Sequence, residues 1–177
     1  MIWSKEKYNE WDAINKEEIK NHINKRHSIY LHSEYGTGKT HFLLWLSKKY
    51  YNQGYGIYFA MFADISRDLK KEIGDRQGGV FNKSINTKMR ECDVLCIDDL
   101  GNEQMTPFTH EALVTAINYR YMNDKATFIT SNYSLKALYN IYEKEVGSTK
   151  AGQLITRIKT FGEIELKAID YRKKYEY

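Results

Sequence analysis

Short apolar runs alternate with amphipathic segments along most of the chain, and this alternation constrains the fold more than any other sequence feature. The runs predict strands around residues 28–32, 55–63, 93–99, 127–132 and 162–168. Helices are predicted at 40–54, 64–74, 82–92, 106–124, 135–145 and 149–160. Nearly continuous apolar strands separated by helices are typical of a parallel sheet covered on both faces. The pattern therefore predicts an α/β fold whose ligand site lies at the carboxyl ends of the strands.

The chain has 177 residues, which is enough for one domain with a hydrophobic core. Residues 1–25 carry charges of both signs, with apolar residues at helical spacing. We therefore expect an N-terminal helical extension packed on a single domain formed by residues 26–177.

Composition narrows the possible partners and compartment. The formal net charge of +4 mildly favours polyanionic partners, although an ordinary basic surface explains it equally well. Cys92 and Cys96 imply no disulfide framework, so we expect a reducing cytoplasm. The sequence lacks an apolar run of membrane-spanning length and a signal-peptide core, so we expect no membrane association.

A phosphate-binding signature follows the first predicted strand. The general pattern is Gly-x-x-x-x-Gly-Lys-Ser/Thr; here Gly38, Lys39 and Thr40 form its end, and Ser33 occupies the first glycine position. Serine fits there if its φ angle is negative. We expect Lys39 to reach the β- and γ-phosphates and the Thr40 hydroxyl to bind Mg²⁺. The expected nucleotide-binding residues are Ser33, Glu34, Tyr35, Gly36, Thr37, Gly38, Lys39, Thr40 and His41.

Two carboxylates, Asp98 and Asp99, end the third predicted strand. Beside a phosphate loop, Asp98 is expected to hold Mg²⁺, and Asp99 is expected to orient or deprotonate the attacking water. Alternation of side chains along a strand would let the two acids take different roles. Alone, two acids after a strand are more often a turn, and Asp99 is one methylene shorter than the glutamate common at such positions.

Three later polar residues complete the candidate site. Asn132 ends the fourth predicted strand, where it could hold the lytic water or simply belong to a turn. Arg157 lies on a late helix and is either a solvated side chain or an arginine that completes a neighbouring subunit's site. Arg172, after the last predicted strand, could contact the phosphates of its own subunit.

Six segments in order resemble one family. They are GTGKTHFLLWL, VLCIDDLGNE, ALVTAINYRY, TFITSNYSLKAL, ITRIK and DYR. Together they resemble the ATPase domain of bacterial helicase loaders of the DnaC/DnaI type and the similar transposition ATPase IstB, which are AAA+ proteins. The resemblance covers residues 28–173, nearly the whole chain after the N-terminal segment.

The resemblance implies a P-loop three-layer sandwich with a parallel sheet in the order 5-1-4-3-2 and without a large helical lid. It implies binding and hydrolysis of ATP with Mg²⁺, with Asn132 as the polar sensor, Arg157 as the arginine finger and Arg172 as a second sensor. It also implies a head-to-tail spiral, single-stranded DNA and a hexameric DnaB-type replicative helicase as partners.

Two other functions stay open at this point. One is a transposition helper, which would share every catalytic residue. The other is a nucleotide-dependent helicase-binding module that hydrolyses slowly or not at all. Family members usually carry a separate helicase-gripping domain, so this chain is expected to be either a naturally short phage or mobile-element form or a domain of a longer protein.

A candidate DNA surface lies between the second and third predicted strands. Residues 64–91 carry seven Lys and Arg against five Asp and Glu. Such a surface could track phosphates, with one aromatic face for base stacking, or it could be an ordinary solvated helix pair. The candidate residues are Lys70, Lys71, Arg76, Phe81, Lys83, Lys88 and Arg90.

Overall fold

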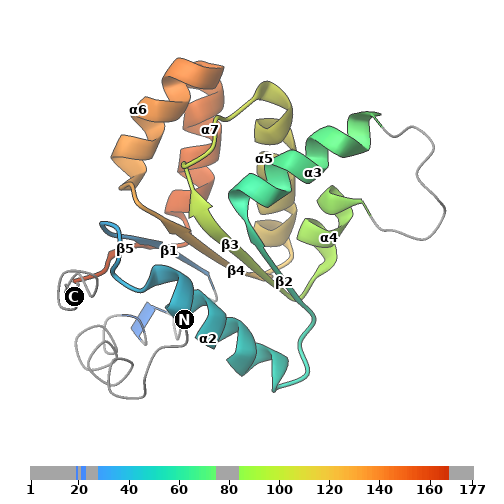
Figure 1. Ribbon diagram of the computed structural model, residues 1–177, viewed down its shortest axis with the longest axis vertical. Helices are drawn as coiled ribbons and strands as arrows, with labels where there is room; N and C mark the ends of the chain where they lie inside the picture. The colour runs from blue at the N-terminus through green and yellow to red at the C-terminus, as the bar shows by residue number, and fades with distance from the viewer. Residues whose placement is uncertain (1–18, 20, 23–27, 75–83, 168–177) are drawn as a thin grey trace, which may run out of the picture.

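A computed structural model describes residues 19, 21–22, 28–74 and 84–167, and its centre is a five-stranded parallel sheet. The strand order is β2-β3-β4-β1-β5, which confirms the predicted order 5-1-4-3-2 when it is read from the other edge (Figure 1). The strands are β1 Ile29–His32, β2 Ile57–Met61, β3 Val94–Leu100, β4 Ala126–Ser131 and β5 Glu163–Glu165.

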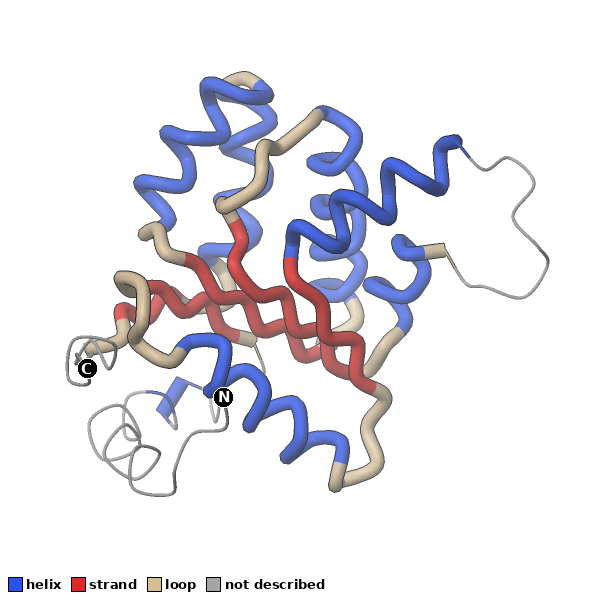
Figure 2. The backbone as a smooth tube through the Cα atoms, viewed as in Figure 1, coloured by secondary structure: helices blue, strands red, loops and turns tan. Residues whose placement is uncertain are grey.

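Helices cover both faces of the sheet, but unevenly. One face carries α2, and the opposite face carries the other five labelled helices (Figures 1 and 2). The three-layer arrangement is therefore confirmed. Within the described residues, no helix has both the length and the apolarity that a membrane crossing needs. The helices are α2 Lys39–Tyr51, α3 Phe62–Gly74, α4 Ile85–Glu91, α5 Pro107–Met122, α6 Leu135–Val146 and α7 Ser148–Lys159.

Alternating side chains of the central strands form two separate hydrophobic clusters. Along β3, Leu95 and Ile97 pack into the cluster under α3 to α7, while Val94 and Cys96 pack into the cluster against α2. Side chains of a strand point alternately to the two faces of the sheet, so an apolar residue at every position fills both cores. Ile19 belongs to the α2 cluster; the rest of the predicted N-terminal helix lies outside the described residues except for a short helical stretch at 21–22.

The start of α5 shows how local sequence fixes a helix boundary. The Thr106 hydroxyl accepts a hydrogen bond from the Thr109 N–H at 3.2 Å, and the Thr109 hydroxyl accepts one from the Thr106 N–H at 2.9 Å. Pro107 occupies the first helical position, where its missing N–H has no cost. The prediction of Thr106 as the N-cap is confirmed.

Three predicted boundaries were wrong. The segment 55–63 is not one strand, because β2 ends at Met61 and α3 begins at Phe62 without a loop. The helix predicted to reach Gly54 ends at Tyr51, and the chain turns through Gly54 with a φ of 89°. The last strand is also shorter than predicted. Apolar residues continue across the junction of β2 with α3 and beyond the end of β5, so the hydrophobic pattern does not mark those two boundaries.

A buried arginine joins the starts of β3 and β4. Arg120, near the end of α5, is fully buried. Its guanidinium donates hydrogen bonds to the carbonyls of Met89 at 3.0 Å, Cys92 at 2.8 Å and Asp93 at 3.0 Å. It also donates to the Thr127 hydroxyl at 2.9 Å. The guanidinium of arginine has five N–H donors in a fixed plane and can bond several carbonyls at once. The ammonium of a lysine is a single point charge and would not satisfy them all.

Replacing Arg120 with methionine should lower the free energy of unfolding by about 3 kcal/mol, because several buried carbonyls lose their donor at once. Urea denaturation followed by circular dichroism measures the effect. Lys125→Met is a matched control, since Lys125 donates to the carbonyls of Glu91 and Cys92 at the surface. The control should cost less than about 1 kcal/mol. Equal losses in the two variants would show that Arg120 does not hold the strand starts together.

Candidate nucleotide-binding site

The loop between β1 and α2 has the backbone that a phosphate site requires. Gly36 and Gly38 have φ angles of 82° and 90°, a left-handed region in which other residues are strained. Gly38 is the N-cap residue of α2 and makes no side-chain cap. The N–H groups and the dipole at the start of this helix favour an anion there.

Ser33 stabilises this loop instead of disturbing it. Among the described non-glycine residues, positive φ occurs at Asp99 and Asp124, so Ser33 keeps the negative φ that was predicted. Its hydroxyl forms a hydrogen bond with the Thr37 hydroxyl at 2.5 Å. Its N–H donates to the Ser131 carbonyl at 3.3 Å, which ties the loop to β4. A glycine at this position would keep the backbone bond to Ser131 but would lose the hydroxyl contact with Thr37.

The Lys39 side chain is 5% exposed and folds back over the loop. Its Nζ donates to the carbonyls of Ser33 and Glu34, each at 2.8 Å. A buried ammonium group needs such oxygen partners. Phosphate oxygens are stronger acceptors than carbonyls, so a bound phosphate would compete for this group.

A bulge separates the two acids at the end of β3. Ile97 pairs with Ile129 and Leu100 with Ser131, so β3 uses one more residue than β4 over this stretch. Asp99 takes a φ of 58°. The prediction that simple strand alternation separates the acids was therefore wrong. The bulge gives Asp98 and Asp99 different environments; Asp98 is 1% exposed, and Asp99 is half-buried.

Two hydroxyl groups of β4 form hydrogen bonds with the polar groups of the bulge, and neither residue was predicted from the sequence. The Thr130 hydroxyl donates to the Asp98 carboxylate and accepts from the Asp99 N–H at 3.1 Å. The Ser131 hydroxyl donates to the Leu100 carbonyl at 2.6 Å. The available signal was a pair of hydroxyl residues at the end of an otherwise apolar buried strand, because such groups need partners.

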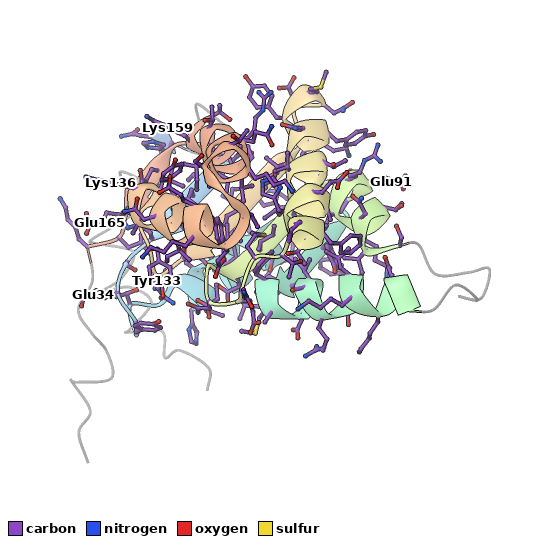
Figure 3. All side chains as sticks on the ribbon, turned by 90° about the horizontal axis from the view of Figure 1, so that it is seen from above. Glu34, Glu91, Tyr133, Lys136, Lys159 and Glu165 are labelled. Atoms are coloured by element: carbon purple, nitrogen blue, oxygen red, sulfur yellow. The ribbon has the colours of Figure 1, made fainter. Side chains whose placement is uncertain are left out.

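Asn132 lies one residue beyond β4, the strand between β1 and β3. Its Nδ2 donates to Asn102 Oδ1 at 3.2 Å. The Tyr30 hydroxyl donates to the Tyr133 carbonyl at 2.7 Å, and burial raises the pKa of Tyr30, which keeps this donor protonated. Figure 3 shows Tyr133 and Glu34 on the same side of the molecule. Asn132 thus comes directly after β4, and β4 lies between the strand that leads into the phosphate loop and the strand that carries the two acids.

Arg157 does not join this group in its own chain. It is exposed in the last turn of α7, and its guanidinium lies over the Tyr121 ring at 5.8 Å from the centroid. Helix α7 leads into β5 at the amino end of the sheet, and in Figure 3 Lys159 lies apart from Glu34. Arg172 lies outside the described residues.

The candidate DNA residues that the structure describes lie on two helices in contact with each other, α3 and α4. Lys70 and Lys71 are exposed on α3, where Lys71 Nζ lies 3.5 Å from an Asp68 oxygen. Lys88 and Arg90 belong to α4, and the Arg90 guanidinium stacks on the Tyr119 ring at 4.5 Å. Arg76, Phe81 and Lys83 lie outside the described residues. The structure therefore leaves the DNA surface a prediction.

The site fits ATP with Mg²⁺. The loop and Lys39 would hold the phosphates, and Thr40 in the first turn of α2 would face the metal with Asp98. In the described ranges, no group of three or more His, Cys, Asp or Glu side chains is placed to hold a metal. Mg²⁺ does not require such a group, because it usually keeps waters and binds one or two carboxylates together with substrate phosphates.

The sheet order, the glycine-rich loop and the acidic strand end define a P-loop nucleotide-binding protein of the AAA+ type. Within that class, residues 9–176 match the family described as IstB-like ATP binding protein, and the chain belongs to this family. The family assignment made from the sequence is confirmed.

Known relatives match the same region. The chain is 27% identical over 145 residues to the replicative helicase loader DnaI of Bacillus subtilis (strain 168), covering 78% of this chain and 45% of that protein. It is 31% identical over 126 residues to the phage-like element PBSX protein XkdC of the same strain, covering 67% of this chain and 45% of that protein. The chain thus spans less than half the length of these relatives.

Solved structures support the fold. The crystal structure of the DnaC helicase loader matches with a TM-score of 0.60 and 25% identity, covering 79% of this chain and 78% of that one.

Ser33→Gly should leave nucleotide affinity within about tenfold of the parent, because the hydroxyl braces the loop from within. Isothermal titration with ADP measures it. Ser33→Ala removes the same hydroxyl without adding backbone freedom, so it should bind at least as tightly as Ser33→Gly. A loss well beyond tenfold in both variants would mean that the hydroxyl itself binds the nucleotide.

Proposed function

We propose that this protein binds ATP with Mg²⁺, hydrolyses it to ADP and phosphate, and acts in DNA replication as a loader of the replicative helicase. The observation that carries the proposal is the arrangement at the carboxyl ends of three adjacent strands. The phosphate loop with Lys39 follows β1, Asn132 follows β4, and Asp98 and Asp99 end β3.

Each of these residues has a role that its environment supports. Lys39 neutralises charge on the β- and γ-phosphates, and Mg²⁺, held by Thr40 and Asp98, supplies further charge neutralisation when bound. Asp99 is more accessible than Asp98 and orients or deprotonates the attacking water. Asn132 holds that water from the neighbouring strand. Arg172, whose only support is the family resemblance, is proposed as a second sensor.

A second copy of the chain completes the site. Arg157 is exposed in the last turn of α7, which leads to the amino end of β5 and so away from the phosphate loop of its own chain. In a head-to-tail spiral it would reach the neighbouring copy's phosphates, where an arginine stabilises the charge of the transition state.

The proposed partner is a hexameric DnaB-type helicase in the bacterial cytoplasm. Its support is the similarity to the loader DnaI and to the DnaC loader structure. The match to a phage-like element protein supports a phage or mobile-element origin. The division of the chain into an N-terminal extension (1–25) and an ATPase domain (26–177) is also part of this proposal.

Single-stranded DNA is the proposed polyanion partner. Its support is a hollow of about 480 Å³ beside α3, lined by Arg67, Lys70 and Lys71 together with Glu103 and two small residues. Phosphate contacts of this kind would make binding strongly dependent on salt.

The strongest alternative is a transposition helper, which the IstB-like family assignment favours. It would share the catalytic residues and differ in its partner. Capture of a DnaB-type helicase from the native host would support the loader, and capture of a transposase would support the helper. A binding module without turnover is the remaining alternative, and measurement of hydrolysis decides it.

Lys39→Ala and Asp98→Ala should each lower DNA-stimulated ATP hydrolysis by at least about 100-fold, because each removes charge stabilisation at the reacting phosphate. Phosphate release with saturating single-stranded DNA measures it. Lys136→Ala, an exposed lysine on α6, is the matched control and should match the parent. Hydrolysis that persists in both site variants would refute the enzymatic function, and ADP binding without any turnover in the parent would favour the binding module.

Arg157→Ala should also lose hydrolysis while it keeps nucleotide binding. A mixture of Arg157→Ala and Lys39→Ala proteins should regain turnover, because one protein supplies an intact loop and the other an intact arginine. The mixture and each variant alone are assayed at equal total concentration. A mixture no more active than its components would contradict the completion of the site by a second copy.

A further inference from the structure

A tight turn after the bulge fixes the direction of the chain beside the candidate site. The Asn102 N–H donates to the Asp99 carbonyl at 3.4 Å. Gly101 takes a φ of 98°, and a Cβ added there would lie 2.6 Å from a Leu138 methyl carbon and 3.0 Å from a carbon of the Tyr133 ring. A side chain at Gly101 is thus excluded both by its backbone angle and by its neighbours.

This turn brings the Asn102 amide to Asn132. Asn132 Nδ2 donates to Asn102 Oδ1 at 3.2 Å. The backbone just after Asn132 is held by two other bonds, the Tyr133 N–H to the Ser131 hydroxyl at 3.1 Å and the Tyr30 hydroxyl to the Tyr133 carbonyl. Those bonds leave the side-chain torsions of Asn132 undetermined. The bond to Asn102 restricts them.

We propose that Asn102 is a positioning residue that orients the Asn132 amide for hydrolysis. This inference rests on the proposed function. With one Nδ2 proton donated to Asn102, Asn132 retains its second Nδ2 proton and Oδ1 for the attacking water or a γ-phosphate oxygen. Fixing a side chain before the reaction removes an orientational cost from the transition state. Because the turn begins at Asp99, it links the orientation of the amide to the acid that acts on the same water.

Stability alone does not explain the pair. The Asn102 side chain is exposed, and a hydrogen bond between accessible amides adds little to the stability of a fold. Asn102 contributes an acceptor oxygen, so aspartate should replace it and alanine should not. Solvent screens the added charge at this exposed position.

The decisive measurement is steady-state ATP hydrolysis by the full chain. Asn102→Ala should lower kcat about tenfold and leave ADP affinity within about twofold, because the Asn132 amide loses its fixed orientation toward the attacking water and the γ-phosphate, which ADP lacks. Asn102→Asp should keep kcat within about threefold of the parent. Gln104→Ala and Gln104→Glu, two residues along the same exposed loop, control for truncation and for added charge and should match the parent.

A double variant tests whether Asn102 acts through Asn132. In an Asn132→Ala background, Asn102→Ala should change kcat by less than about twofold, since the partner is already absent. A further tenfold loss in that background would overturn the inference. So would a fully active Asn102→Ala, or an Asn102→Asp as slow as Asn102→Ala.

A failure of the inference is distinguishable from a failure of the proposed function. Turnover by the parent tests the function, and the ratios between variants test Asn102. If the parent proves inactive, the affinity ratio for ATP over ADP, measured by titration calorimetry, decides instead. Asn102→Ala should lower that ratio at least about threefold and Asn102→Asp should preserve it; equal ratios in all three proteins would overturn the inference.

Discussion

One hydroxyl group organises the reacting end of the molecule. Thr130 Oγ1 donates to Asp98 and accepts from the N–H of Asp99, so a single atom satisfies the carboxylate and the strained backbone of the bulge. Without the Thr130 hydroxyl, the Asp98 carboxylate and the Asp99 N–H would each lose a hydrogen bond, and such losses at buried or half-buried groups are costly. The different environments of Asp98 and Asp99 therefore depend on Thr130 in the neighbouring strand.

Local pattern predicted the strands and helices of a parallel α/β fold, and the family resemblance supplied the order of the sheet. Local pattern failed where distant partners decide the geometry. The apolar runs, Gly38 and Pro107 act within a few residues of themselves, so strands, loop and helix start were predictable. The bulge was not, because Asp99 and Thr130 are 31 residues apart in sequence and meet only across the sheet. The junction of β2 and α3 was missed for a related reason: Phe62 is buried in either structure, so hydrophobicity does not distinguish them.

Net charge is a poor guide to the binding surface of this protein. Several of the cations between residues 64 and 91 are committed to internal contacts, as Arg67 is to Asp64 and Arg90 to the Tyr119 ring. Exposed ion pairs contribute little to stability, but they reduce the field that a polyanion meets. The hollow beside α3 brings Lys70 and Lys71 together on one wall, although Lys71 lies beside Asp68.

The direction of the parallel strands explains why the proposed role of Arg157 would require a second copy. A helix that returns from the carboxyl end of one strand to the amino end of the next carries its last turn away from the nucleotide. Arg157 lies in such a turn, on α7 before β5, so the crossover holds it away from its own loop. The Tyr121 ring, at the end of the neighbouring crossover helix α5, lies under its guanidinium and keeps it at the surface. In the proposed mechanism, a charge presented outward at the amino edge would reach a phosphate only across an interface between two copies, which is the geometry of the proposed head-to-tail assembly.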